Sequence, residues 1–279
     1  MKRFLAVFDG FQLSESTLSY ALQLSKTSNA SLTGVFLDEF IYRNYDVTKV
    51  IRSGSDYEKV MADLDQKDEK RRDEAVRQFQ NACSKAGITF EIHRDKSLAL
   101  QELKEESMFA DLVIIDEYET FSRHKEEPPT RFIKDLLSDV QCPVLVVPNH
   151  YKKIDEIVLL YDGRPSSLYA IKQFSYLLGE FQDLPLEVLT VNEQSENLHL
   201  PDNKRMKDFI KNMFPQATFT VKEGSAEEQI VDHLREHQEN ELVVLGAYRR
   251  TELSRWFKTS MADILMRNLD TPLFIAHNK

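Results

Sequence analysis

The chain contains an internal duplication, and this feature constrains its fold more than any other. The first half opens FLAVFDGFQLSESTLSYALQLSK and the second opens IVLLYDGRPSSLYAIKQFSYLLG, so that Asp9-Gly10 and Asp162-Gly163 each follow a short apolar run. The halves also close alike, with ADLVIID and CPVLVVP in the first and NELVVLG and TPLFIAH in the second. We therefore predict two tandem domains, residues 1–149 and 154–279, joined by a polar linker.

Within each half, apolar strand-like runs alternate with segments of helical periodicity. The second half shows this most clearly: IVLLY, LEVLTV, ELVVLG and PLFIAH are strand-like, and NKRMKDFIKNMF and AEEQIVDHLREHQ carry apolar residues at helical spacing. Continuous Val/Ile/Leu strands between helices are typical of a parallel sheet covered on both faces. The prediction is an α/β protein with two tandem, doubly wound, five-stranded parallel-sheet domains of Rossmann-like type.

The first half holds an additional segment in its middle, over about residues 56–86. It reads as a long, highly charged amphipathic helix with apolar Val60, Leu64, Ala75, Val76 and Phe79. We expect a solvated helix laid on the domain surface, and a partner-binding arm is the alternative.

Charge and composition exclude several classes of protein. A hydrophobic content of 42% with 29% charged residues is typical of a soluble globular chain. The formal net charge of -10 argues against nucleic-acid binding, because phosphates would be repelled over most of the surface. We find no signal peptide and no apolar stretch that could span a membrane. Cys83 and Cys142 have no metal-ligand spacing, so we expect free thiols that pack in a reducing, cytoplasmic setting.

Ligands of doubly wound sheets bind at the carboxyl ends of the strands, where the strand order reverses. In the second half this places DGRPSS (162–167) and GAYRRTELSRWFKTS (246–260) at the site. Asp162 follows a strand and could accept hydrogen bonds from an adenine amino group or a ribose hydroxyl. Ser260 begins a helix as its expected N-cap, where a hydroxyl and free N–H groups suit a phosphate.

Together these motifs resemble the universal stress protein family, in its tandem, UspA-like form with the adenine nucleotide alpha hydrolase-like fold. The resemblance is carried by Asp-Gly after the first strand, Glu223-Gly224, the Leu-Val-Val-x-Gly strand and the terminal x-Pro strand. It implies a loop of the form G-x2-G-x9-G-[S/T] in members that bind ATP. Here Gly246 and Ser260 match its ends, whereas Arg249 and Thr259 occupy the second and third glycine positions.

These departures remove backbone freedom beside a phosphate, although Arg249, Arg250 or Arg255 could contact it through side chains instead. Whether the second half binds an adenine nucleotide such as ATP, with Mg²⁺ only alongside it, or carries a degraded site stays open. The nucleotide-binding candidates are Asp162, Gly163, Val191, Gly246, Arg249, Arg250, Thr259, Ser260 and Met261. In the first half Asp116 replaces Gly246 and acidic neighbours follow, so we expect no nucleotide there.

Two further patterns receive structural interpretations. His233 and His237 lie four residues apart on a predicted helix, and with no third ligand we expect a solvent-facing pair rather than a metal site. Trp256 and Phe257 lie between basic residues and are interpreted as an apolar anchor of their loop.

The resemblance implies a non-catalytic protein of the stress response, without catalytic or metal-binding residues. A nucleotide-independent interaction or scaffold protein with two degenerate sites is the alternative, and a weak ATP hydrolase is the third. Single-domain members of the family resemble dimers paired through their last strands. We therefore expect the two halves to pair as an intramolecular pseudo-dimer, and the sequence leaves an unknown protein partner and a further homodimer open.

Overall fold

The computed structural model of this chain describes residues 1–37, 57–95, 99–122, 125–192, 199–236, 240–246 and 260–277. The first half comprises β1 (Arg3–Asp9), α1 (Glu15–Thr27), β2 (Ser31–Leu37), α3 (Tyr57–Ala86), β3 (Phe90–Asp95), α4 (Ala99–Ser107), β4 (Leu112–Asp116), α5 (Arg131–Asp139) and β5 (Val144–Val147). The second comprises β6 (Glu156–Leu160), α6 (Pro165–Leu177), the 3-10 helix η3 (Gly179–Asp183), β7 (Leu186–Asn192), α7 (Asn203–Met213), β8 (Thr218–Glu223), α8 (Ala226–Glu236), β9 (Glu241–Gly246), α9 (Met261–Asn268) and β10 (Leu273–Ala276).

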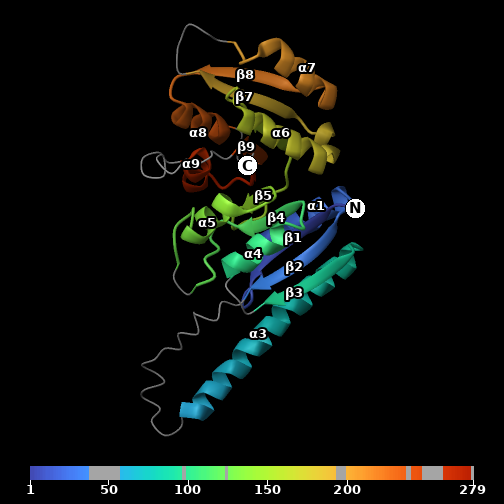
Figure 1. The fold of residues 1–279 in the computed structure, drawn as a ribbon, viewed down its shortest axis with the longest axis vertical. Helices are drawn as coiled ribbons and strands as arrows, with labels where there is room; N and C mark the ends of the chain where they lie inside the picture. The colour runs from blue at the N-terminus through green and yellow to red at the C-terminus, as the bar shows by residue number, and fades with distance from the viewer. Residues whose placement is uncertain are drawn as a thin grey trace.

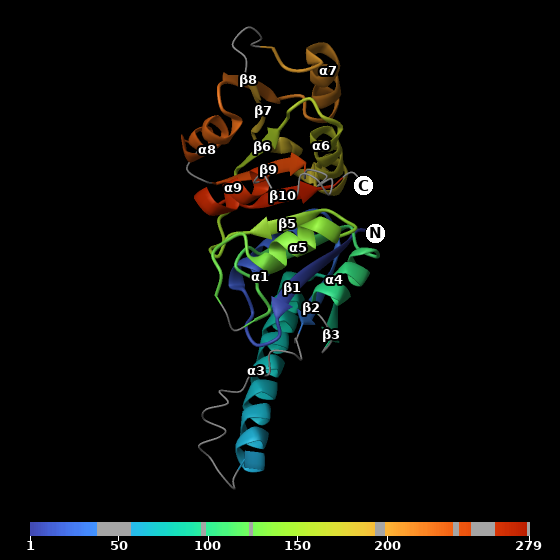
Figure 2. The ribbon, with the colours of Figure 1, turned by 60° about the vertical axis from the view of Figure 1, so that its left-hand side comes forward.

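The described strands form one ten-stranded sheet in the order β3-β2-β1-β4-β5-β10-β9-β6-β7-β8. Neighbouring strands within each half are parallel, whereas β5 and β10 are antiparallel, with Val146 opposite Leu273 and Val144 opposite Ile275. This pairing joins the halves into an elongated molecule (Figures 1 and 2). The predicted α/β, doubly wound architecture is thereby confirmed.

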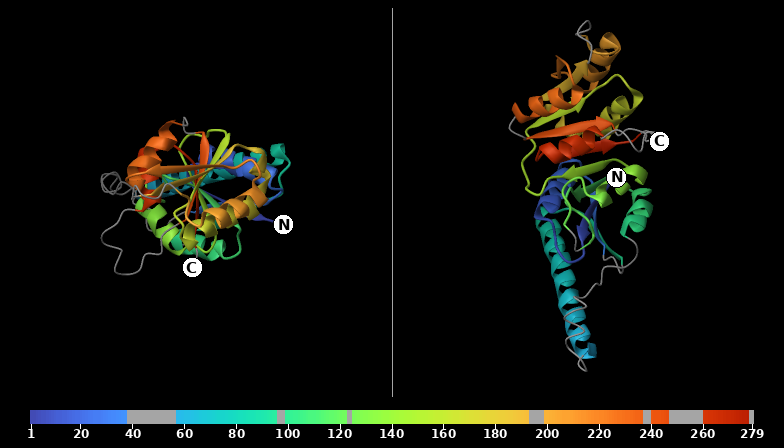
Figure 3. Two further views of the ribbon diagram at one scale, coloured as in Figure 1. Left: turned by 90° about the horizontal axis from the view of Figure 1, so that it is seen from above. Right: turned by 90° about the vertical axis from the view of Figure 1, so that its left-hand side faces the viewer.

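Side chains that alternate along the strands supply two cores, one on each face of the sheet. Along β1, Phe4 and Phe8 point into the core covered by α1, α3, α6 and α7, whereas Leu5 and Val7 point into the core covered by α4, α5, α8 and α9. Helices therefore flank the sheet on both sides (Figure 3). Because both faces are buried, the strands read as continuous apolar runs in the sequence.

Helix α3 packs on the sheet through its C-terminal part and extends beyond the sheet through its N-terminal part (Figures 1 and 3). Ala75, Val76 and Phe79 are buried, and the ring of Phe79 meets Phe8 edge-on with centroids 5.8 Å apart. Phe79 fits because Gly34 lacks a side chain, since a Cβ there would lie 2.8 Å from the ring. The side chains of Val60 and Leu64 lie outside the described residues.

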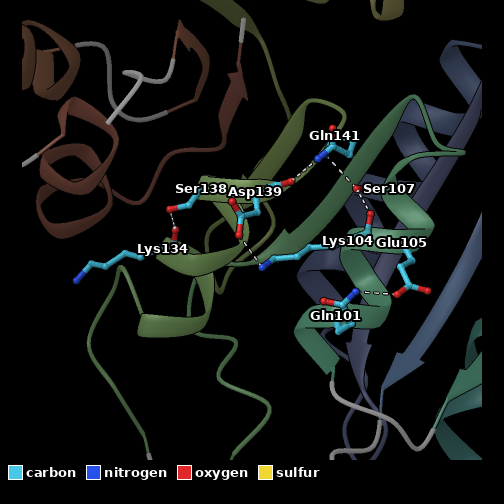
Figure 4. Close-up of polar contacts among 8 residues, drawn as sticks. All are labelled: Gln101, Lys104, Glu105, Ser107, Lys134, Ser138, Asp139 and Gln141. Atoms are coloured by element: carbon cyan, nitrogen blue, oxygen red, sulfur yellow. Dashed lines mark hydrogen bonds and ion pairs between the residues drawn. The ribbon is translucent and has the colours of Figure 1, made fainter. Parts of the chain in front are cut away.

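On the opposite face, polar contacts hold α4 against the end of α5 (Figure 4). Lys104 Nζ lies 2.7 Å from Asp139 Oδ2, and the Ser107 hydroxyl accepts a hydrogen bond from the N–H of Gln141 at 3.0 Å. These contacts anchor the connection into β5, the strand through which the first half meets the second.

Candidate functional site

Each half has a switch point where the strand order reverses, between β1 and β4 in the first and between β6 and β9 in the second. In the second half Asp162 and Gly163 follow β6, Gly246 ends β9, and Ser260 and Met261 begin α9. Val191 lies near the end of β7, the neighbour of β6 on its other side. The predicted residues Arg249, Arg250 and Thr259 lie outside the described residues, so their predicted contacts stay predictions.

The carboxylate of Asp162 organises the turn between β6 and α6. Its Oδ1 accepts hydrogen bonds from the N–H of Arg164 at 3.0 Å and from the hydroxyl of Ser167 at 2.6 Å. Gly163 adopts a positive φ of +78°, and a Cβ at this position would lie 2.7 Å from Pro201. Asp162 and Gly163 therefore shape the end of β6, and Pro201 lies directly against that turn.

Gly246 is required by the packing of β9 against α6. A Cβ at this position would lie 2.5 Å from the carbonyl carbon and oxygen of Ser166 and 2.7 Å from the backbone nitrogen of Ser167. Its φ lies outside the left-handed region, so close approach is the constraint rather than conformational freedom. The first turn of α6 therefore contacts both residues. Its Ser167 hydroxyl donates to Asp162, and the backbone of Ser166 and Ser167 lies against Gly246.

Ser260 is the N-cap of α9, as the sequence predicts. Its hydroxyl accepts a hydrogen bond from the N–H of Asp263 at 3.1 Å and donates one to Asp263 Oδ1 at 2.7 Å. The serine side chain therefore caps the helix, and the acidic side chain of Asp263 in the first turn complements the helix dipole. The sequence interpretation missed Asp263, although a carboxylate three residues after a serine cap is its recognisable signal.

The equivalent switch point of the first half is lined by carboxylates. Asp116 lies in the position of Gly246 and accepts hydrogen bonds from the Ser14 hydroxyl at 2.8 Å and from the N–H of Tyr118 at 2.9 Å. Glu119 accepts the N–H groups of Thr120 and Phe121, both at 3.0 Å, so backbone donors that would suit a phosphate already face a carboxylate. The N–H groups of Thr120 and Phe121 are therefore already engaged by a carboxyl group of the chain itself.

Burial and mutual repulsion raise the pKa values of these carboxyl groups. The pKa of Glu119 rises to about 8, first through burial and then through Asp9 and Asp116, against the two N–H groups that lower it. The pKa of Glu117 also rises to about 8, through burial and the charges of Asp116 and Asp270. Burial raises the pKa of Asp116 as well. At neutral pH Glu117 and Glu119 therefore largely carry protons, which reduces the repulsion among these carboxyl groups.

The expectation that His233 faces solvent is wrong. His233 is only 7% exposed, and its Nε2 lies 2.7 Å from Oε2 of Glu187 on β7, a carboxylate that also accepts a hydrogen bond from Thr220. Helix α8 turns this histidine toward the sheet because it compensates a buried carboxylate. Glu187, a lone acid within the apolar run LEVLTV, was the signal that could have indicated it. His237 lies outside the described residues.

The two cysteines are buried thiols, as predicted. Burial raises the pKa of both Cys83 and Cys142 to about 12, so neither is activated as a thiolate. Within the described residues, no group of three His, Cys, Asp or Glu side chains could hold a metal ion. None of the described helices is long and apolar enough to cross a membrane.

Solved structures with this fold cover almost the whole chain. A universal stress protein from Archaeoglobus fulgidus DSM 4304 aligns with a TM-score of 0.70 and 13% identity, covering 99% of this chain and 98% of that one. A provisionally assigned universal stress protein from Pseudomonas aeruginosa UCBPP-PA14 aligns with a TM-score of 0.62 and 15% identity, covering 99% and 93%. A protein of unknown function from Pseudomonas aeruginosa PAO1 gives 0.60 and 14%, covering 99% and 92%.

No family model and no curated protein matches the sequence. At identities of 13–15% the structural likeness establishes the fold. The chain therefore has the fold of the universal stress proteins along nearly its whole length, and the resemblance read from its motifs is confirmed at that level.

Proposed function

We propose that this chain is a non-catalytic protein of stress adaptation that binds an adenine nucleotide through its second half alone. The fold shared with universal stress proteins supports the stress-response role. The contrast between the two switch points supports the restriction to one half, and it is the observation that carries the proposal.

In the second half, strand β9 ends at Gly246, and helix α9 begins with Ser260 as its N-cap. The Ser260 hydroxyl forms hydrogen bonds with Asp263, and Asp162 follows β6 at the switch point of the same half. A hydroxyl and the first N–H groups of α9 are donors that suit a phosphate. In the first half, carboxyl groups of Asp116 and Glu119 already accept the hydroxyl and N–H donors at the corresponding switch point, so fewer donors remain for a phosphate.

Two alternatives differ in what they predict for a nucleotide. A scaffold protein would use the same fold with both switch points closed, and would not respond to ATP, ADP or AMP. A weak ATP hydrolase would bind ATP and also release phosphate above background.

Thermal unfolding with and without Mg-ATP, ADP and AMP tests the proposal, with Ser260→Ala and Thr130→Ala as a matched pair. Thr130 caps α5 as Ser260 caps α9, accepting the N–H of Ile133 at 3.2 Å, so each variant loses one N-cap worth about 1 kcal/mol. A nucleotide at about 100 times its Kd stabilises the folded chain by about 2.7 kcal/mol, or roughly 5 °C in Tm.

We expect this nucleotide-dependent rise in Tm in the unmodified chain and in Thr130→Ala, and its loss in Ser260→Ala. Asp9→Ala should keep the rise because it alters the first half. No shift with any of the three nucleotides would favour the scaffold alternative, and a shift that survives Ser260→Ala would contradict the assigned site.

A further inference from the structure

The sheet has an open edge at β8, two strands beyond β6 and its switch point. Strand β8 pairs with β7 and ends the strand order, so no strand of the described part of the chain lies on its other side. Figure 1 shows β8 beside α7 at one end of the molecule. An edge strand presents unpaired backbone N–H and C=O groups, which can pair with a strand of another chain.

The backbone groups that face this open edge follow from the pairing of β8 with β7. The N–H of Gly224 donates to the carbonyl oxygen of Asn192 at the end of β7 at 3.0 Å. Backbone groups of successive strand residues point to opposite sides of the strand. The N–H and C=O groups of Phe219, Val221 and Glu223 therefore point away from β7, toward the open side.

One side of α7 places three lysines beside this edge. Lys207 Nζ lies 5.6 Å from the centroid of the Phe219 ring on β8. Lys204 and Lys211 lie three residues before and four residues after Lys207, a spacing that places them on the same side of the helix. All three are exposed, and no described carboxylate forms an ion pair with any of them. The α7 face of the edge therefore carries a row of positive charge.

This charge discriminates between possible occupants of the edge. A second copy that paired through β8 about a two-fold axis would bring both α7 helices to the same face of the joined sheet, where their lysines would repel each other. Helix α7 carries four basic residues and one acidic residue, Asp208, in a chain of net charge -10. Exposed charges are screened beyond about 8 Å at physiological salt, so the nearby lysines dominate the field at the edge. An acidic occupant is therefore favoured.

We propose that the β8 edge binds an extended segment of a protein partner that has acidic residues at alternate positions. The segment adds a strand beside β8 and forms hydrogen bonds with the outward-pointing backbone groups. Side chains of a strand alternate between the two faces of a sheet, so every second residue of the segment points to the α7 face. Carboxylates at these positions pair with Lys204, Lys207 and Lys211, and this pairing fixes the register. Binding at this edge does not depend on a nucleotide in the second half.

Fluorescence anisotropy of the full chain with two labelled heptapeptides tests the proposal. The first peptide, Glu-Thr-Glu-Val-Glu-Thr-Glu, places all its carboxylates on one face of a strand. The second peptide, Glu-Glu-Thr-Val-Thr-Glu-Glu, has the same composition and charge but divides the carboxylates between both faces. A preference for the first peptide therefore reports strand addition rather than a general attraction to acidic chains.

Two pairs of variants separate the backbone from the lysines. Glu223→Pro removes an N–H that points to the open edge, whereas Glu223→Gln removes the same charge and keeps that N–H, so their difference measures the donor. Lys207→Gln combined with Lys211→Gln removes two charges beside the edge and leaves the backbone unchanged, so it tests the site even if proline disturbs the strand. The control removes Lys26 and Lys85 in the same way, because both are exposed on helices of the first half.

We expect the first peptide to bind the unmodified chain and the control alike, and about fivefold more tightly than the second peptide. Its binding should be about tenfold weaker in Glu223→Pro than in Glu223→Gln, and about fivefold weaker in the variant that lacks Lys207 and Lys211. No binding of either peptide, equal binding of both, or equal binding to the lysine variant and its control overturns the proposal. A dimer in sedimentation that Glu223→Pro abolishes also overturns it, because the edge then pairs with a second copy.

Discussion

At the scale of single residues, the two halves differ most at one pair of equivalent positions, Asp116 and Gly246. Gly246 lets a helix backbone approach to a distance that any Cβ would forbid. Asp116 brings a carboxylate to the same place and binds the Ser14 hydroxyl. A hydrogen-bonded carboxyl group thus lies in the first half at the position where the second half has no side chain.

Glu117 should make the stability of the chain depend on pH. Its pKa is about 8 in the folded chain and near 4.5 otherwise, so the folded state keeps a proton that the unfolded state has released. The free energy of unfolding should therefore fall as the pH rises from about 4.5 to about 8. Between pH 5 and pH 8 we expect the free energy of unfolding of the unmodified chain to fall by roughly 2 kcal/mol or more relative to that of Glu117→Gln.

Urea unfolding at pH 5, 6, 7 and 8 measures this loss, with Glu228→Gln as the control for removing one carboxyl group. The control should follow the unmodified chain, and Glu117→Gln should lie on a flatter curve. Three parallel curves would show that Glu117 has no raised pKa in the folded state.

The sequence predicted some of these residues and not others. An acidic run after a strand is visible as a local feature, so the carboxyl groups at the switch point of the first half could be predicted. The packing requirement of Gly246 could not, because it depends on where α6 begins. The burial of Glu117 could not either, because it depends on how the folded chain packs around the end of β4.

At the scale of elements, the two halves differ in where their first helix begins. Helix α6 begins at Pro165, three residues after Asp162, whereas α1 begins at Glu15, six residues after Asp9. The backbone of the first turn of α6 lies against Gly246, whereas the Asp116 side chain accepts a hydrogen bond from Ser14, the N-cap of α1. The two halves therefore differ both at the strand end and at the helix start.

Replacing Gly246 by alanine should disturb this strand–helix contact. The added Cβ would lie 2.5 Å from backbone atoms of Ser166, which cannot rotate away as a side chain would. We expect a loss of roughly 1–3 kcal/mol in the free energy of unfolding, as for other overpacked sites.

Gly179→Ala is the matched control, because no atom lies within 4 Å of the Cβ position at Gly179 and its φ is not positive. Denaturant unfolding of both variants measures the difference. Equal stability of the two variants would mean that α6 can shift away from β9 without cost.

Element types were predictable because the period of the apolar residues differs between helix and strand. The long helix expected over residues 56–86 corresponds to α3, and the five strands of each half are those predicted. The orientation of α8 was not predictable from its own apolar residues alone. His233 faces the sheet because Glu187 lies on β7, and that pairing spans two elements.

At the scale of the whole molecule, duplication allows the two halves to share a fold while their switch points diverge. The antiparallel pairing of β5 with β10 joins them in one sheet, so a change in one switch point leaves the framework of the other intact.

The stoichiometry of nucleotide binding tests this division most directly. Calorimetric titration of the full chain with Mg-ATP counts the sites, and Ser260→Ala identifies the half that holds them. The account predicts one Mg-ATP per chain and none in Ser260→Ala. Two per chain, none in the unmodified chain, or one that persists in Ser260→Ala would contradict it.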